Sequence, residues 1–363
     1  GIGGAVYGRG ADLLFLDDYY KNIEEARSEV KRNAVLHWFT TIAMSRLHTN
    51  GSVVILATRW DQKDLSAELL KLTGSRWTEI NLPAEALQPH EFPKGEPNYK
   101  DPLGRAPGEP LWPEFFNKDR LQELKETMGS FQYAATYQQN PRKLDSDIFK
   151  RHWIRIANVL PHRSRLRFLR SWDLAGTDGG GDWTCGLKVA LDMETNILYL
   201  VDMIRVQKTP GQVKKLVEET AEADGVECGV VIEQEPGSSG KSVAEEYQML
   251  LAKYATHTTR HTGDKFTRLE PFLAAAEFGR VYMLEGDWNE EYLDEMASFP
   301  SDEAGNHDDQ VDVTSQAYNH LFKKVARAGS WGRDSTAIAT QGKIQTRASN
   351  GGGQVITGVT WGR

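Results

Sequence analysis

The chain has 363 residues, 39% of them hydrophobic, which is enough for two domains with apolar cores. Its formal net charge of −8 excludes a basic DNA-coating protein, although an acidic protein can still bind DNA through one basic groove or through metal ions. No run approaches the ~18 apolar residues of a membrane span, and two cysteines are too few for a disulfide framework or a multi-cysteine zinc site. Such cysteine usage is expected in a reducing cytosol.

The N-terminal part predicts an α/β arrangement. Residues 11–18 and 52–58 are short apolar runs that predict buried strands, and residues 23–48 predict one helix between them. Buried strands separated by helices are typical of a parallel sheet. The proline-rich residues 83–113 predict a loop or lid, and residues 117–139 predict a helical region.

A second pattern begins at residue 166. Three strands are predicted in succession, at 166–174, 183–191 and 197–206. Helices and strands then alternate: helices at 210–224, 240–254, 265–278, 289–297 and 308–323, strands at 226–233 and 280–284. A β-meander followed by alternating helices and strands predicts a ribonuclease H-like mixed sheet.

Acidic residues lie at the ends of three of these elements. Asp173 is late in one strand, Glu233 ends another, and Asp308, Asp309 and Asp312 open the last helix. An ionised carboxylate on a buried strand costs several kcal/mol unless it is paired or bound to metal. Hydrolysis of a phosphodiester by in-line attack uses two Mg²⁺ ions, which prefer oxygen ligands. Each acid taken alone is explained as a helix cap or a structural ion pair, whereas the set together predicts a site for two Mg²⁺ or Mn²⁺ ions.

Seven segments, in order, carry a resemblance to a known family. They are Gly-Arg-Gly-Ala-Asp-Leu-Leu-Phe-Leu-Asp-Asp (8–18), Ala-Thr-Arg-Trp (57–60), Tyr-Gln-Gln-Asn-Pro (137–141), Ser-Trp-Asp-Leu-Ala-Gly-Thr (171–177), Glu-Gln-Glu-Pro-Gly-Ser-Ser-Gly-Lys (233–241), Gly-Asp-Lys-Phe-Thr-Arg (263–268) and His-Asp-Asp-Gln-Val-Asp (307–312). With them the chain resembles bacteriophage terminase large subunits, the motors that package viral DNA, from Gly8 to about Phe322.

The resemblance implies a domain organisation and a nuclease site. It implies the C-terminal part of a P-loop-type, parallel-sheet ATPase domain with its lid over 1–140, a linker over 141–165, a ribonuclease H-like nuclease over 166–325 and a flexible basic tail over 326–363. The catalytic acids implied are Asp173, Glu233 and Asp309, and Asp308 and Asp312 are further metal ligands. DNA-backbone contacts are expected from three basic residues, for which surface or helix-start roles are the alternative: Lys241, Lys265 and Arg268.

The resemblance also implies part of a nucleotide site. Asp17 ends an apolar strand as the Mg²⁺-linked Asp of a Walker B segment does, and Asp18 stands where the water-activating acid, usually Glu, is expected. Thr58 and Arg59 resemble the coupling motif, although Arg59 is equally explained as an ordinary salt bridge. Residues before Asp17 contain no Gly-rich phosphate loop, so we expect ATP to be a cofactor of the full-length protein and this chain alone to hydrolyse it poorly.

The function implied is endonuclease cleavage of concatemeric double-stranded viral DNA during packaging, with ATP-driven translocation in the full-length protein. Expected partners are DNA, the portal protein and the small terminase subunit, with a possible homo-oligomeric ring on the portal and no membrane. The expected location is the host bacterial cytoplasm, transiently on the procapsid and not in the mature virion. Two alternatives stay open: a Holliday-junction resolvase-like or transposase-like nuclease, and a non-catalytic packaging module that binds the portal.

Overall fold

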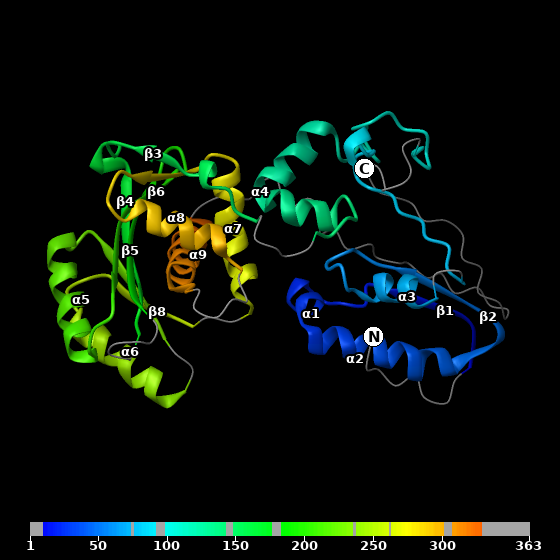
Figure 1. Cartoon of the computed structure of the whole chain (residues 1–363), viewed down its shortest axis with the longest axis horizontal. Coiled ribbons are helices and arrows are strands. Elements are labelled where there is room, and N and C mark those ends of the chain that lie inside the picture. The colour runs from blue at the N-terminus through cyan, green and yellow to red at the C-terminus, as the bar shows by residue number, and fades with distance from the viewer. Residues whose placement is uncertain are drawn as a thin grey trace, which may run out of the picture. The chain divides into compact units, whose positions relative to one another are not determined.

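The computed structural model describes most of the chain up to residue 328 (Figure 1). The described ranges are 10–73, 76–91, 99–142, 148–175, 183–234, 237–260, 263–300 and 307–328, without the side chains of 238, 239 and 323–328. Residues Gly1–Leu321 and Phe322–Arg363 form two separate units. The predicted flexible tail therefore lies, from residue 329 onwards, outside the described residues.

The first strands form a small parallel sheet. β1 (Ala11–Asp17) pairs with β2 (Leu47–Leu56), in agreement with the predicted parallel arrangement. The prediction that both strands are buried is wrong, because Leu13, Phe15 and Leu56 on one face are more than half exposed. The other face packs Leu16 into a cluster with residues of the following helices. The P-loop-type domain itself stays a prediction.

The predicted single helix over 23–48 is wrong. The segment forms α1 (Ile23–Arg27) and α2 (Glu29–Trp38), then a π turn (Phe39–Ala43) and a 3₁₀ turn (Met44–Arg46). Ser28 explains the break, because its extended backbone (φ −71°, ψ 115°) ends α1 and its hydroxyl accepts a hydrogen bond from Lys31 N at 3.4 Å, capping α2.

The middle of the chain follows the prediction more closely. α3 (Leu65–Thr73) precedes the proline-rich stretch, whose described residues include a 3₁₀ turn (Pro89–Glu91) and no helix or strand longer than that turn, as expected. α4 (Lys118–Thr136) begins after Asn117, whose side chain accepts from Arg120 N at 2.9 Å.

Seven strands form the main sheet, in the order β3-β9-β6-β5-β4-β7-β8. Their bounds are β3 (Arg155–Ala157), β4 (Leu166–Asp173), β5 (Thr184–Asp192), β6 (Leu198–Val206), β7 (Gly229–Glu233), β8 (Thr256–Thr259) and β9 (Val281–Leu284). β4, β5 and β6 are antiparallel neighbours, which confirms the predicted meander, and β7 and β8 continue the sheet in parallel from β4. β3, inside the predicted linker, and β8 were not predicted as strands.

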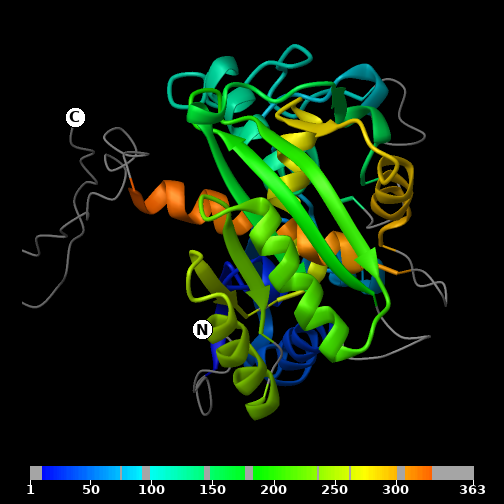
Figure 2. The same cartoon turned by 90° about the vertical axis from the view of Figure 1, so that its left-hand side faces the viewer.

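Helices cover both faces of this sheet (Figures 1 and 2). α5 (Pro210–Asp224) and α6 (Ser238–Leu250) lie on one face, and α8 (Asn289–Ser298) and α9 (Asp309–Ala328) lie beyond the other. α7 (Lys265–Glu277) comes between β8 and β9 in the chain. None of the helices in the described ranges has the length and apolar character needed to cross a bilayer.

The end of β4 is anchored in the core beneath α5 and α6. Trp172 is 1% exposed and packs with Val217, Ile232 and Tyr247. Its ring lies over Gly186 of the neighbouring strand, where a Cβ atom would come within 2.4 Å of Trp172 Cζ3. Gly186 therefore makes room for the residue that fixes the position of Asp173.

Candidate active site

Asp173 and Glu233 end two central, neighbouring strands. The register of parallel strands β4 and β7 runs through the pair Trp172 and Ile232, and the two acids are the next residues on each strand. Adjacent strands lie about 4.8 Å apart. The two predicted acids therefore lie next to each other at the carboxyl ends of two neighbouring strands, as the sequence pattern indicated.

The first turn of α9 adds the third acid. Asp309 is 8% exposed, its Oδ2 lies 3.4 Å from the backbone N of Trp183, and His307 Nδ1 lies 3.7 Å from the same oxygen. At a helix N-terminus the macrodipole favours such a negative charge. Asp309 therefore lies on the helix side of the sheet, near the carboxyl end of β4.

A buried glutamate, which sequence reasoning missed, holds this turn of α9. Glu295 on α8 accepts hydrogen bonds from Gln310 N at 2.6 Å and from Gln310 Nε2 at 2.7 Å. The pKa of Glu295 is raised to about 7, because the effect of burial exceeds the opposing effects of the hydrogen bonds from Gln310 and the charge of Arg205. Arg205 also lies 4.1 Å above the Trp183 ring. No sequence motif marked Glu295, because its role depends on how α8 packs against α9.

Lys265 and Arg268 are paired with the outer acids of the turn. Lys265 Nζ lies 2.7 Å from Asp308 Oδ2 and 2.8 Å from Asp312 Oδ2, and Arg268 Nη2 lies 2.5 Å from Asp312 Oδ1. Burial opposes the charge on Lys265, but the hydrogen bonds to Asp308 and Asp312 raise its pKa above the ordinary value. Two of the five predicted metal ligands are therefore held by cations of the chain itself.

The electrostatics single out Asp173. Burial, together with the negative charges of Glu233, Asp312 and Asp309, raises the pKa of Asp173 to about 8, against a smaller opposing effect of Lys265. Carboxylates that disfavour one another's ionisation in this way carry more negative charge than their surroundings neutralise. The cluster therefore favours a positively charged ligand.

The carboxylates of this cluster have the right chemistry to bind a hard divalent cation, but they do not form a complete metal site in this structure. Carboxylate oxygens on two strands and one helix are the ligands that Mg²⁺ and Mn²⁺ prefer. Among the residues that the structure describes, however, no three His, Cys, Asp or Glu side chains form a group that could hold a metal ion as they stand. The predicted metal pair at Asp173, Glu233 and Asp309 therefore stays a prediction.

The four predicted nucleotide-site residues lie at the ends of β1 and β2. Asp18 has a positive φ of 42°, and its Oδ1 accepts from Thr58 N at 3.3 Å. Arg59 Nε lies 2.6 Å from Asp64 Oδ2, and this fully buried carboxylate also accepts from Ala67 N at the start of α3. Arg59 thus forms the ordinary salt bridge that was considered in place of a coupling role. Asp17 is the last residue of β1 and directly precedes Asp18.

Lys241 and the Gly-rich stretch around it open α6. Lys241 is exposed, with Glu245 3.6 Å away. Gly237 has φ 101°, a conformation that favours glycine. Residues 235 and 236, directly before Gly237, lie outside the described residues.

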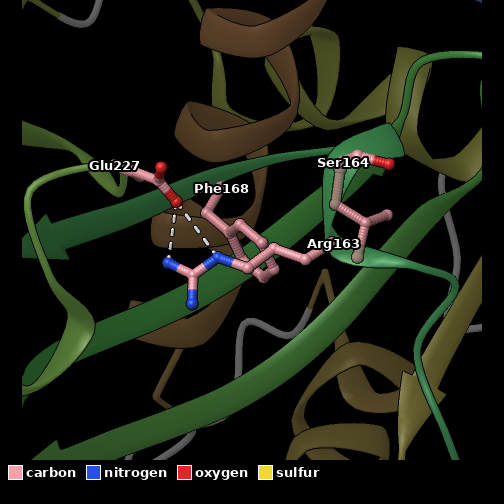
Figure 3. Close-up of a pocket in the computed structure, with 5 residues that line it drawn as sticks. Arg163, Ser164, Phe168 and Glu227 are labelled. Carbon is pink, nitrogen blue, oxygen red and sulfur yellow. Dashed lines mark hydrogen bonds and ion pairs between the residues drawn. The ribbon is translucent and has the colours of Figure 1, made fainter.

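A separate pocket lies at the opposite end of β4 (Figure 3). It is lined by Arg163, Ser164, Leu166, Phe168 and Glu227, and Figure 3 shows the Arg163 guanidinium directed at the Glu227 carboxylate, 2.9 Å away. Leu166 begins β4 and Asp173 ends it, so at about 3.3 Å per residue the pocket is roughly 20 Å from the acids. It contains none of the predicted site residues.

The antiparallel β4–β5–β6 meander, continued in parallel by β7 and β8, is the arrangement that the sequence predicted for a ribonuclease H-like domain. Residues 170–321 match the family model of the terminase RNaseH-like domain. The match supports the assignment to terminase large subunits that the seven motifs predict. None of the curated proteins matches the chain.

Several solved structures are similar to the chain. The nuclease domain of the P22 large terminase is 12% identical, covering 49% of this chain and 92% of that one, with a TM-score of 0.39. The large terminase nuclease of thermophilic phage G20c with bound magnesium is 14% identical, covering 49% and 98%, with a TM-score of 0.36. The fowlpox virus Holliday junction resolvase is 10% identical, covering 43% and 99%, with a TM-score of 0.30.

Proposed function

We propose that the domain formed by residues 166–325 is a two-metal-ion endonuclease that cuts concatemeric double-stranded viral DNA during genome packaging. The observation that carries this proposal is the convergence of Asp173 and Glu233 at the ends of adjacent central strands, with Asp309 approaching from α9. The terminase RNaseH-like match over residues 170–321 supports it.

Asp173, Glu233 and Asp309 would hold the metal ions. Divalent metal ions bound there would supply an activated water and stabilise the leaving oxygen. Asp308 and Asp312 hold the ammonium of Lys265 and the guanidinium of Arg268 at the start of α9, where these cations would lie beside a bound phosphate. These two cations can exchange part of their pairing with the acids for a DNA phosphate, since charge-assisted contacts to either group are comparable.

The wider packaging role belongs to the same proposal. Lys241, exposed at the start of α6, is a further candidate for contact with the DNA backbone. Such contacts are insensitive to base sequence, so cleavage should show weak sequence preference. The full-length protein would couple ATP hydrolysis to translocation, bind the portal and the small terminase subunit, and act as a ring on the procapsid in the host cytoplasm.

Cleavage of plasmid DNA tests the activity directly. We expect nicking and linearisation of supercoiled plasmid with Mg²⁺ or Mn²⁺ and no cleavage with EDTA, because the bound metal ions would supply the activated water and stabilise the leaving oxygen. The measurement is the rate of loss of supercoiled DNA on agarose gels, with linear duplex and a four-way junction as parallel substrates.

The substrates separate the alternatives. Strong preference for the junction over linear duplex would contradict the packaging role in favour of a resolvase-like one. Binding to portal protein without cleavage under either metal would contradict a nuclease and favour the non-catalytic packaging module.

A further inference from the structure

Gln316 is buried beneath the three acids. It lies on α9 seven residues after Asp309, about two helical turns, and is 4% exposed. Because residues seven apart share a face of the helix, Gln316 faces the sheet from the same side as Asp309. No sequence motif marks this residue.

The Gln316 amide contacts the ends of three strands. In the orientation that satisfies its neighbours, Nε2 donates to Ser171 Oγ (2.5 Å) and to the backbone O of Trp172 (3.2 Å). Its Oε1 accepts from the backbone N of Glu233 (3.0 Å) and from Thr259 Oγ1 (2.7 Å). One side chain thus bonds to the residue before Asp173 on β4, to Glu233 itself on β7, and to the end of β8.

From these contacts we infer that Gln316 is a positioning residue, which fixes the separation of Asp173 and Glu233 and so prepares them to share a metal ion. This inference rests on the proposed function. The last pair in the β4–β7 register is Trp172 and Ile232, so the acids extend just past it. The Gln316 amide bridges the two strands at that point, through Trp172 O and Glu233 N.

The physical reason is that Gln316, Ser171 and Trp172 are buried, so their polar groups need hydrogen-bond partners within the protein. An unpaired buried N–H or C=O is costly, so the strand ends would shift if the amide were removed. Loss of a group that orients a metal ligand through hydrogen bonds typically weakens metal binding 10- to 100-fold. Gln316 acts on the backbone of the ligand residues and does not itself need to touch the metal.

The test compares two substitutions on the same helix. Gln316→Met keeps the length of the side chain and removes its hydrogen bonds. The matched control is Thr314→Val: Thr314 is 1% exposed, and its hydroxyl bonds to Tyr292 Oη at 3.0 Å and to Gln310 O at 2.6 Å, none of them on β4, β7 or β8. Mn²⁺ binding is measured by titration calorimetry without DNA, and exchange of the Glu233 backbone N–H by NMR without metal.

We expect Gln316→Met to weaken Mn²⁺ binding about 10- to 100-fold and to accelerate exchange of the Glu233 N–H. Thr314→Val should change neither, even if it lowers the melting temperature as much. Should Gln316→Met fail to fold, Ser171→Ala removes one of the four contacts and should weaken binding in the same direction.

Two results would contradict the proposals, and each of them contradicts a different proposal. Equal Mn²⁺ affinity and equal Glu233 exchange in the parent and Gln316→Met would overturn the positioning role while leaving the nuclease intact. A parent protein that binds no Mn²⁺ at all would instead overturn the proposed function.

Discussion

Asp173→Asn should lose at least about a hundredfold of the metal-dependent cleavage rate. Bound metal contributes several kcal/mol of transition-state stabilisation, and each 1.36 kcal/mol corresponds to a factor of ten in rate. The substitution should not unfold the protein. Burial and the neighbouring acids raise the pKa of Asp173 to about 8, so its charged form is unfavourable in the metal-free fold. The melting temperature without metal should therefore stay equal or rise.

Glu227→Gln is the control for this prediction. Glu227 is an exposed acid on the same domain, paired with Arg163 at the other end of β4. It should cleave plasmid at the parental rate. An Asp173→Asn protein that is folded and cuts as fast as the parent, with contaminating nuclease excluded, would refute the assignment of the active site.

Arg170→Met should lower the free energy of unfolding by about 3–5 kcal/mol, the usual cost of breaking a buried ion pair from one side. Arg170 is 3% exposed, and it binds the buried Asp224 through Nε at 2.8 Å and Nη2 at 3.1 Å. Asp202 and the backbone O of Gly186 accept from its Nη1. Without the guanidinium, Asp224 keeps only part of its compensation, from Lys188 at 2.7 Å. Urea unfolding followed by circular dichroism measures the difference.

Arg163→Met provides the matched comparison, because Arg163 also pairs with one acid but is exposed, and such pairs contribute less than about 1 kcal/mol. The pH dependence gives a second check. Burial alone would raise the pKa of Asp224, but Arg170 and Lys188 hold it below its ordinary value. The stabilisation is therefore present above the unfolded pKa of about 3.9 and is lost as pH falls through the lower folded value. Equal losses for Arg170→Met and Arg163→Met would contradict this account.

The sequence predicted the nuclease domain well because its pattern is local. Apolar runs marked β4, β5 and β6, and acids at the ends of such runs marked Asp173 and Glu233. β8 escaped prediction because Thr-His-Thr-Thr has no apolar alternation and is a strand only through its pairing with β7. β3 has three residues and forms only against β9.

The errors and omissions come from contacts between elements. The helix predicted over 23–48 overlooked Ser28 as a cap, which competes with helix continuation. The predicted phosphate-binding role of Lys265 and Arg268 did not include their ion pairs, because these depend on how α7 lies against the start of α9. Glu295 and Gln316 were missed for the same reason: a buried Glu or Gln on an amphipathic helix carries no local sign of the strand or turn that it holds.

Anomalous diffraction from crystals soaked in Mn²⁺ measures the metal site itself. We predict Mn²⁺ peaks coordinated by carboxylate oxygens of Asp173, Glu233 and Asp309, with those side chains turned toward one another and Lys265 still beside Asp312. Crystals in which Mn²⁺ binds elsewhere, or in which the three carboxylates stay apart at saturating Mn²⁺, would contradict the proposed hydrolysis at this site.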